Sequence, residues 1–233
     1  MLTEAERQFF DMQGYLHVPA VLDAGHVTHL QAEFDRVWEL EGKPVNQIKL
    51  LKHQTFIDLI GHAPILNRHK AVFGEQIQLL QFDLLRQGPR SEMPERGWHR
   101  DFHFPGDTAL SVNTILYLDD ITEESGPTYV VPGSQRGSEL PPRDGLAKPL
   151  PEEIAVHAKA GDAVFINSAI WHSGGRNQGE GLRRAIYLYY GYWFLKRYEF
   201  NQPLPWQALA GADEERLRLL GVKMPGRDLH MYL

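Results

Sequence analysis

The chain has 233 residues, of which 42% are hydrophobic and 23% are charged, a composition typical of a single globular domain. Its formal net charge of −6 gives no electrostatic reason to expect binding to nucleic acid or to an anionic membrane surface. Cysteine is absent, which excludes disulfides, thiolate metal sites and a cysteine nucleophile, so any metal must be held by nitrogen and oxygen ligands.

The first ten residues contain acids where a signal peptide would carry basic residues. No run approaches the roughly 18 apolar residues that a membrane span requires. These features predict a cytoplasmic protein.

The first third of the chain has the pattern of helices. Thr3 and Glu6 form a predicted capping box for a helix that ends at Gly14. Asp23 is the predicted cap of a second helix, whose apolar residues recur at helical spacing. One or two further short helices are expected between residues 53 and 73.

From residue 76 the hydrophobic pattern changes to that of strands separated by turn clusters. The predicted strands cover residues 76–86, 98–104, 110–118, 128–131, 154–158, 163–166 and 182–195. Because no helices alternate with them, we expect a closed or two-sheet antiparallel structure rather than a parallel sheet. The prediction is one domain over 1–233, with a mostly helical cover (1–75), a β core (76–197), and a C-terminal helix (212–220) and tail within 198–233.

The segment Trp98-His99-Arg100-Asp101 carries the main chemical signal. Alternation along a strand points His99 and Asp101 to the same side. With His172 from a distant strand they would occupy three corners of an octahedron and leave three positions open. This is the 2-His-1-carboxylate arrangement of non-haem Fe(II) oxygenases. A His-x-Asp pair alone is weak evidence in a chain with 11 histidines, so the surrounding residues matter.

Several segments, in the same order, resemble the phytanoyl-CoA dioxygenase family of Fe(II)- and 2-oxoglutarate-dependent oxygenases. They are Gly14-Tyr15-Leu16-His17-Val18, Trp98-His99-Arg100-Asp101, Leu118-Asp119-Asp120, Glu124-Ser125-Gly126-Pro127, Val131-Pro132-Gly133-Ser134, Gly161-Asp162-Ala163-Val164-Phe165, Trp171-His172 and Leu182-Arg183-Arg184-Ala185-Ile186. The resemblance covers most of the chain. It implies a mainly β fold with flanking helices, built on a double-stranded β-helix (a jelly roll, as in cupins).

The resemblance also implies roles for particular residues. His99, Asp101 and His172 would be the iron ligands. Arg183 would hold the distal carboxylate of 2-oxoglutarate, because a guanidinium matches a carboxylate with two parallel hydrogen bonds. Its neighbour Arg184 should face the opposite side of the strand.

Four further residues are candidates for contacts in the same site. Gln81, Tyr117 and Ser173 either contact the cosubstrate or simply line the barrel. His103 lies on the same predicted face as His99 and either contacts substrate or ends the strand. The tyrosines between 187 and 192 are better explained by packing than by a pocket. The loops 87–97, 105–109 and 135–152, together with the N-terminal helices, are expected to shape the mouth of the barrel.

The implied activity is a dioxygenase reaction with Fe(II), 2-oxoglutarate and O₂, in which a small molecule is hydroxylated or otherwise oxidised and succinate and CO₂ are released. The intact Asp101 favours hydroxylation, since halogenating relatives have a small residue there.

Two alternatives stay open: a metal-dependent cupin-like hydrolase or isomerase, and a non-catalytic metabolite-binding barrel. Neither gives Arg183 a task. Arginines 86, 90, 96 and 100 suggest either an anionic substrate or an ordinary surface. The oligomeric state is left open.

Overall fold

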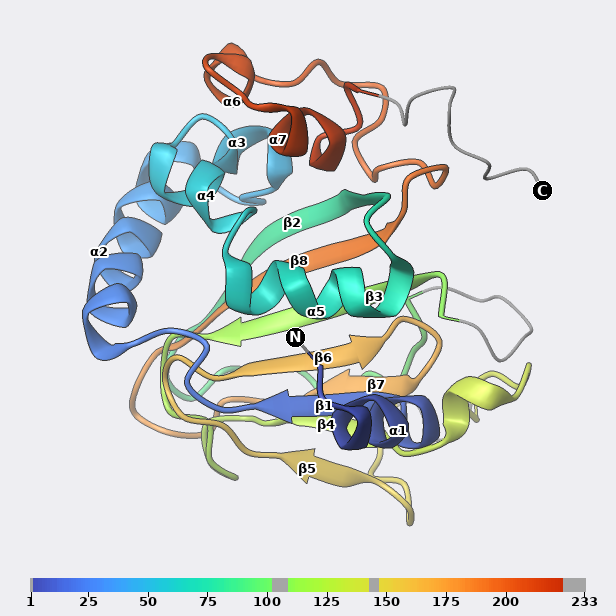
Figure 1. The fold of residues 1–233 in the computed structure, drawn as a ribbon. Helices are drawn as coiled ribbons and strands as arrows, with labels where there is room; N and C mark the ends of the chain where they lie inside the picture. Colours follow the sequence, from blue (N-terminus) through green and yellow to red (C-terminus); the bar gives the residue numbers. More distant parts are fainter. Residues whose placement is uncertain (1, 102–108, 143–146, 224–233) are drawn as a thin grey trace, which may run out of the picture.

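The computed structural model describes residues 2–101, 109–142 and 147–223 (Figure 1). Its strands form two antiparallel sheets, one of five strands in the order β1-β6-β3-β8-β2 and one of three strands in the order β5-β4-β7. The strands are β1 (Tyr15–Val18), β2 (Ile77–Gln87), β3 (Ser111–Tyr117), β4 (Thr128–Val131), β5 (Ile154–Val156), β6 (Ala163–Asn167), β7 (Trp171–Gly174) and β8 (Arg183–Tyr192).

Most of the helices precede β2 in the sequence; α1, α3, α5 and α7 contact strands of the larger sheet, and α6 contacts α4. They are α1 (Glu4–Gln13), α2 (Ala24–Glu41), α3 (Gln47–Leu50), α4 (Gln54–Leu59), α5 (Ala63–Phe73), α6 (Trp206–Leu209) and α7 (Glu214–Leu219), with a 3₁₀ turn η1 (Ser134–Arg136). No helix among the described residues is both long enough and apolar enough to cross a bilayer.

The caps predicted from sequence are present. The Thr3 hydroxyl accepts a hydrogen bond from the Glu6 backbone N–H at 3.2 Å, and the Glu6 carboxylate accepts one from the Thr3 N–H at 2.7 Å. The helix ends at Gly14, whose positive φ of 79° places it in the left-handed region that glycine tolerates. Asp23 caps α2 by accepting from the His26 N–H at 2.9 Å. Local sequence therefore determines where α1 and α2 begin.

Alternation along the strands of the large sheet gives it a hydrophobic core on each of its two faces. On β8, Ile186, Leu188 and Tyr190 face the helices and pack with residues such as Phe34 and Phe56. The opposite face of the large sheet meets the small sheet in a second core, which contains Ile115, Tyr117, Val130, Val164 and Ala185. Inward-pointing residues of β8 near this second core are therefore available to form a site between the sheets.

The predicted mainly β jelly roll is confirmed, but some predicted elements are wrong. Residues 98–101 form no strand: a single bridge pairs His99 with His172, and residues 102–104 lie outside the described part of the chain. Strand β7, which carries His172, was not predicted because its four residues Trp-His-Ser-Gly lack a strand pattern. The short helices α3 and α6 were also missed, and α7 is shorter than the predicted helix 212–220.

Candidate metal centre and adjoining pocket

The two candidate histidines are brought together by backbone pairing. His172 lies on β7, and His99 pairs with it through two hydrogen bonds, each N–H donating to the other residue's carbonyl at 3.0 Å. Cross-strand neighbours of this kind hold their side chains on the same side of the sheet. The two imidazole rings consequently lie side by side, with centroids 4.2 Å apart.

Asp101 completes the cluster. Its Oδ1 lies 3.4 Å from the Nε2 atoms of both His99 and His172. The potential ligand atoms of the three residues all lie within 4.8 Å of one another. Ligands bound at right angles with bonds of about 2.1 Å would be separated by about 3 Å, so a small relaxation brings these atoms to a single ion. Among the described residues, this is the one group of three or more such side chains that could hold a metal ion.

The second nitrogen of each imidazole is occupied by a backbone carbonyl. His99 Nδ1 lies 2.7 Å from the Gly97 oxygen, and His172 Nδ1 lies 3.1 Å from the Ile170 oxygen. A carbonyl only accepts hydrogen bonds, so each neutral ring carries its proton on Nδ1 and leaves the lone pair of Nε2 facing Asp101. Outer contacts of this kind fix the tautomer and the ring orientation of metal-binding histidines.

The charges of the cluster suit a cation. Burial acts to raise the pKa of the Asp101 carboxyl, but the charge of His172 and hydrogen bonds from both imidazoles, when these rings are protonated and also have an Nε2–H, outweigh it and hold this pKa well below its usual value. The hydrogen bond to Asp101 raises the pKa of His99, against the effect of burial. The carboxylate thus stays ionised, and a metal ion would replace a proton on the imidazoles.

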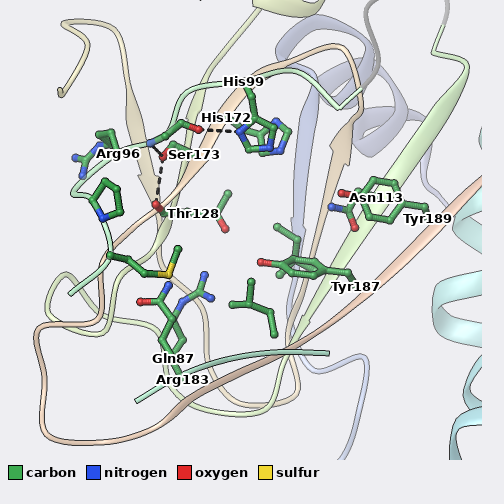
Figure 2. A pocket seen from close by; sticks show the side chains of 16 residues that line it. Gln87, Arg96, His99, Asn113, Thr128, His172, Ser173, Arg183, Tyr187 and Tyr189 are labelled. Carbon is green, nitrogen blue, oxygen red and sulfur yellow. Dashed lines mark hydrogen bonds between the residues drawn. The ribbon is translucent and has the colours of Figure 1, made fainter. Parts of the chain in front are cut away.

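A cavity of about 310 Å³ adjoins the cluster, between the two sheets (Figure 2). Its wall comes from β2, β3, β4, β7 and β8 and from the segment before His99. The lining residues are Leu85, Gln87, Met93, Pro94, Arg96, Gly97, His99, Asn113, Ile115, Thr128, His172, Ser173, Gly174, Arg183, Tyr187 and Tyr189.

Arg183 is fully buried at this cavity. Its Nε donates to the Gly126 carbonyl at 2.8 Å, and its guanidinium lies 5.5 Å from the centre of the Tyr117 ring. Neither terminal nitrogen, Nη1 or Nη2, has a hydrogen-bond partner among the described residues. Buried donors without partners are costly, and a carboxylate in the cavity would satisfy both. The residues present therefore fit 2-oxoglutarate.

The neighbouring Arg184 lies on the opposite face of β8. Its guanidinium binds Asp119 with Nη2 at 2.7 Å and Nε at 3.0 Å, and its Nη1 binds Asp35 of α2 at 2.8 Å. These bonds give every nitrogen of the Arg184 guanidinium a carboxylate partner, one of which belongs to α2. Only Arg183 of the pair reaches the cavity.

The other predicted contacts have different surroundings. Ser173 lines the cavity, but its hydroxyl already accepts from the Gly97 N–H at 2.7 Å and donates to the Gly174 carbonyl at 3.1 Å. Tyr117 is buried beside Arg183, with its hydroxyl 2.5 Å from the Thr128 hydroxyl. Gln81 bonds to the carboxylate of Asp83 and is not part of the cavity wall. His103 lies outside the described residues.

Sequence reasoning missed several lining residues. Tyr187 and Tyr189 were assigned to packing, yet both line the cavity, while Tyr190 is buried on the other face. The sequence could have placed these two tyrosines at the cavity. Residues two apart on a strand share a face, and Tyr187 and Tyr189 are four and six positions after Arg183. Gln87, Asn113 and Thr128 could be found only from the pairing of the strands. Of the segments expected to shape the mouth of the barrel, 87–97 lines the cavity, residues 105–108 lie outside the described part of the chain, and the N-terminal helices are not among the lining residues.

A jelly roll that joins a His-x-Asp and distal-His cluster to a buried arginine has the site of a non-haem iron, 2-oxoglutarate-dependent oxygenase. The family model described as phytanoyl-CoA dioxygenase (PhyH) matches residues 10–185. The chain therefore belongs to the phytanoyl-CoA dioxygenase family, and it is an iron- and 2-oxoglutarate-dependent dioxygenase.

Individual relatives agree with this family. The peroxisomal phytanoyl-CoA dioxygenase of Rattus norvegicus is 23% identical, over 82% of this chain and 69% of its own. The solved structure of HygX from Streptomyces hygroscopicus with nickel and 2-oxoglutarate bound has a TM-score of 0.74 at 20% identity, covering 88% of this chain and 96% of HygX. The carbocyclase SnoK from nogalamycin biosynthesis has a TM-score of 0.67 at 24% identity, covering 82% and 84%. The two structural similarities show the shared fold.

Proposed function

We propose that this dioxygenase hydroxylates a C–H bond of a small-molecule substrate, with His99, Asp101 and His172 as its iron ligands and Arg183 as the anchor of 2-oxoglutarate. The observation that carries the proposal is that the two terminal nitrogens of Arg183 have no hydrogen-bond partner in the described part of the chain and lie at a cavity that His99 and His172 also line. A metal-dependent hydrolase or isomerase that uses no 2-oxoglutarate would leave these two nitrogens without a task.

The mechanism assigns a task to each part of the site. His99, Asp101 and His172 would hold the iron, and a set of only three protein ligands would let it also take up the cosubstrate and oxygen. The iron and 2-oxoglutarate supply the oxidising power. Arg183 holds the far carboxylate, the Gly97 and Ile170 carbonyls hold the imidazoles, and Leu85, Met93, Pro94 and Ile115 give the cavity an apolar wall that limits water.

The class of substrate is proposed from relatives and from the charges in the site. HygX has been solved with hygromycin B bound, and SnoN, an epimerase, with nogalamycin RO. A small organic molecule is therefore the proposed substrate here. Mass analysis of the product separates hydroxylation, which adds one oxygen atom, from ring closure or epimerisation, which add none.

The arginines near the metal segment do not supply a free positive charge to an anionic substrate. Arg90 pairs with Glu180, Arg96 with Glu153, and Arg86 with Glu39. Arg100 donates to the Ser134 and Gly137 carbonyls at 2.6 and 2.7 Å. These contacts favour the alternative, an ordinary surface role for the four arginines.

We also propose that the chain is one domain with a cytoplasmic location. Pairing of β1 with β6 along Tyr15–Val18 supports the first part, because it ties the N-terminal segment into the core sheet. Limited proteolysis and cell fractionation would test the two statements.

Anaerobic titration tests the proposed site directly. Addition of Fe(II) and then 2-oxoglutarate should produce the weak visible charge-transfer band of the chelate. Admission of oxygen should then convert the bound 2-oxoglutarate to succinate and CO₂. A protein that binds the metal but shows no band and releases no succinate would contradict the proposal.

Replacement of Arg183 by leucine should raise the KM or Kd for 2-oxoglutarate about 100-fold, because two charge-assisted hydrogen bonds are lost. Binding of 2-oxoglutarate to the nickel-loaded protein, measured by calorimetry, checks this. Arg184→Leu is the matched control: it removes an arginine from the next position of β8 but faces Asp119 and Asp35 instead. Equal losses in the two variants would contradict the assignment.

A further inference from the structure

The segment that leads into the metal cluster is attached to the core mainly by side chains. The Ser91 N–H donates to the Asn177 carbonyl at 2.7 Å, and the next backbone contacts with the core are those of Gly97 and His99. Among residues 92–96, which lie between these two points of contact, Arg96 is the one residue whose side chain is buried, with 6% of it exposed. The position of residues 92–98 therefore depends strongly on what Arg96 binds.

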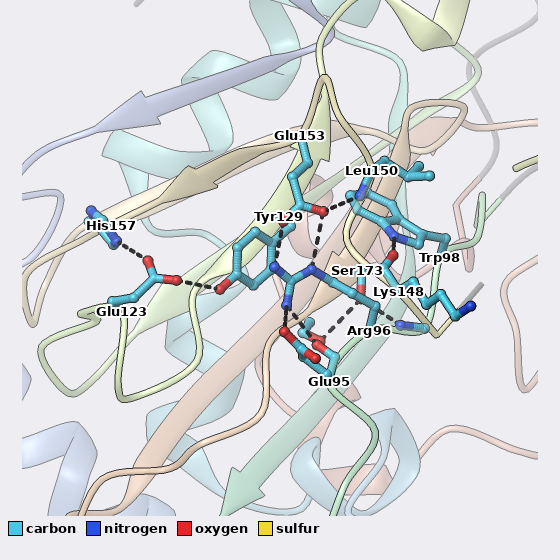
Figure 3. A network of polar contacts seen from close by, with 12 residues as sticks. Glu95, Arg96, Trp98, Glu123, Tyr129, Lys148, Leu150, Glu153, His157 and Ser173 are labelled. Carbon is cyan, nitrogen blue, oxygen red and sulfur yellow. Dashed lines mark hydrogen bonds and ion pairs between the residues drawn. The ribbon is translucent and has the colours of Figure 1, made fainter. Parts of the chain in front are cut away.

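Arg96 makes a forked ion pair and an aromatic stack (Figure 3). Its Nη2 and Nε lie 2.5 and 3.2 Å from the two carboxylate oxygens of Glu153, and its Cζ lies 3.3 Å from the centre of the Tyr129 ring. Glu153 also accepts the Leu150 N–H at 2.8 Å. This arrangement uses both the planar fork and the flat face of the guanidinium, which lysine cannot reproduce.

The partners of Arg96 are themselves held in place. The Tyr129 hydroxyl donates to Glu123 at 3.0 Å, and the other oxygen of Glu123 lies 3.2 Å from His157 Nε2. Tyr129 belongs to β4, the central strand of the small sheet. Arg96 is thus attached to β4 through Tyr129 and, through Glu153, to the residue that directly precedes β5 (Ile154–Val156).

The next residue connects this anchor to the metal ligands. The Gly97 carbonyl is the acceptor for His99 Nδ1, and the Gly97 N–H donates to Ser173, the neighbour of His172. On the far side, Trp98 Nε1 donates to the Lys148 carbonyl at 2.8 Å. The peptide oxygen that orients His99 therefore lies between two buried anchors, Arg96 and Trp98.

We propose that Arg96 is a positioning residue for the metal centre. Its ion pair with Glu153 and its stack on Tyr129 hold the Gly97 carbonyl where it fixes the tautomer and ring orientation of His99. The inference rests on the proposed function, since it takes His99 as a ligand. Arg96 also borders the cavity, but its guanidinium is bound to Glu153, so it acts through the backbone and not as a substrate contact.

Metal affinity without cosubstrate is the measurement that tests this role. Calorimetric titration of the apoprotein with Ni(II) should show weaker binding in Arg96→Ala, with a loss of about 10-fold, the lower end of the effect of losing an outer-shell partner, because the Gly97 carbonyl stays but is no longer held in place. Arg96→Lys keeps the charge without the fork and should recover part of the loss. Glu153→Gln should weaken binding in the same direction. Arg90→Ala is the matched control, because it removes an exposed ion pair from the same segment and should leave affinity unchanged.

A second readout does not involve metal. Nitrogen-15 NMR of the apoprotein, at a pH above the imidazole pKa, should show His99 protonated on Nδ1 in the wild type and a mixture of tautomers in Arg96→Ala. A purely structural role for Arg96 would lower stability without changing this ratio.

The outcomes separate the two proposals. Wild-type Ni(II) affinity and a wild-type His99 tautomer in Arg96→Ala would overturn the positioning role. If that variant does not fold, unchanged affinity in Glu153→Gln would overturn it. His99→Ala serves as the reference: if it binds Ni(II) as the wild type does, the ligand assignment and the proposed function fail instead.

Discussion

Replacing Asp101 by alanine is expected to abolish turnover and to weaken metal binding by at least about 100-fold. Asp101 is the one anionic group in the cluster, and its Oδ1 lies 3.4 Å from both imidazoles. Loss of an outer-shell partner alone typically costs 10- to 100-fold in affinity, and removal of a direct ligand should exceed that. The measurements are Ni(II) titration of the apoprotein and succinate release with Fe(II) present.

The control for Asp101→Ala is Glu92→Ala, which removes an exposed carboxylate from the segment before the cluster. It should keep wild-type metal affinity and succinate release. Oxidation at the wild-type rate in Asp101→Ala would refute the assignment of the ligand set.

Lowering the pH is expected to destabilise the protein through His69, independently of the metal centre. His69 of α5 is completely buried against the outer face of the large sheet, with its Nε2 2.7 Å from the Thr114 hydroxyl and its ring 4.5 Å from that of Tyr190. Nδ1 has no hydrogen-bond partner among the described residues. Burial lowers the pKa of His69 from 6.5 to about 3.

The direction of the change in the free energy of unfolding follows from the protons that His69 binds in each state. Between pH 6.5 and about 3 the unfolded chain binds a proton at His69 that the folded protein does not. The free energy of unfolding therefore falls as the pH drops through this range, by about 1.4 kcal/mol per pH unit below 6.5. From neutral pH to a pH of about 4.5 the loss should be about 2 to 3 kcal/mol. Urea unfolding at the two pH values measures it.

His69→Gln isolates this contribution. Glutamine can keep a hydrogen bond to Thr114 but does not titrate, so the variant should be less stable at neutral pH and should lose less stability on acidification. Other histidines and the carboxylates titrate in both proteins and cancel in the comparison. A variant with the same pH dependence as the wild type would show that His69 does not carry the effect.

The sequence predicted which side chains the structure brings together better than it predicted the elements that carry them. His99, Asp101 and His172 could be named together because a metal site requires particular side chains in a particular order. The strand expected over residues 98–104 was replaced, in its described part, by one bridge to His172. Side-chain anchors such as Arg96 hold this segment, and they depend on Glu153 and Tyr129, which are distant in sequence.

Only some residues of the cavity wall could be predicted from the pattern along a single strand. Tyr187 and Tyr189 could have been assigned to it from their phase with Arg183 on one strand. Asn113, Gln87 and Thr128 come from three other strands, and only the register between strands brings them to one space. The hydroxyl of Ser173 was a reasonable candidate for a cosubstrate contact, but its bond to Gly97 becomes visible only once the segments are assembled.

Strand β1 has a consequence for how the protein should be handled. It forms one border of the five-stranded sheet, and its pairing with β6 covers the backbone of that strand. A shortened version beginning after Val18 would leave the N–H and C=O groups of β6 open to pair with another molecule, the usual route to self-association through sheet borders. Purification tags and truncations at the N-terminus should therefore spare Tyr15–Val18.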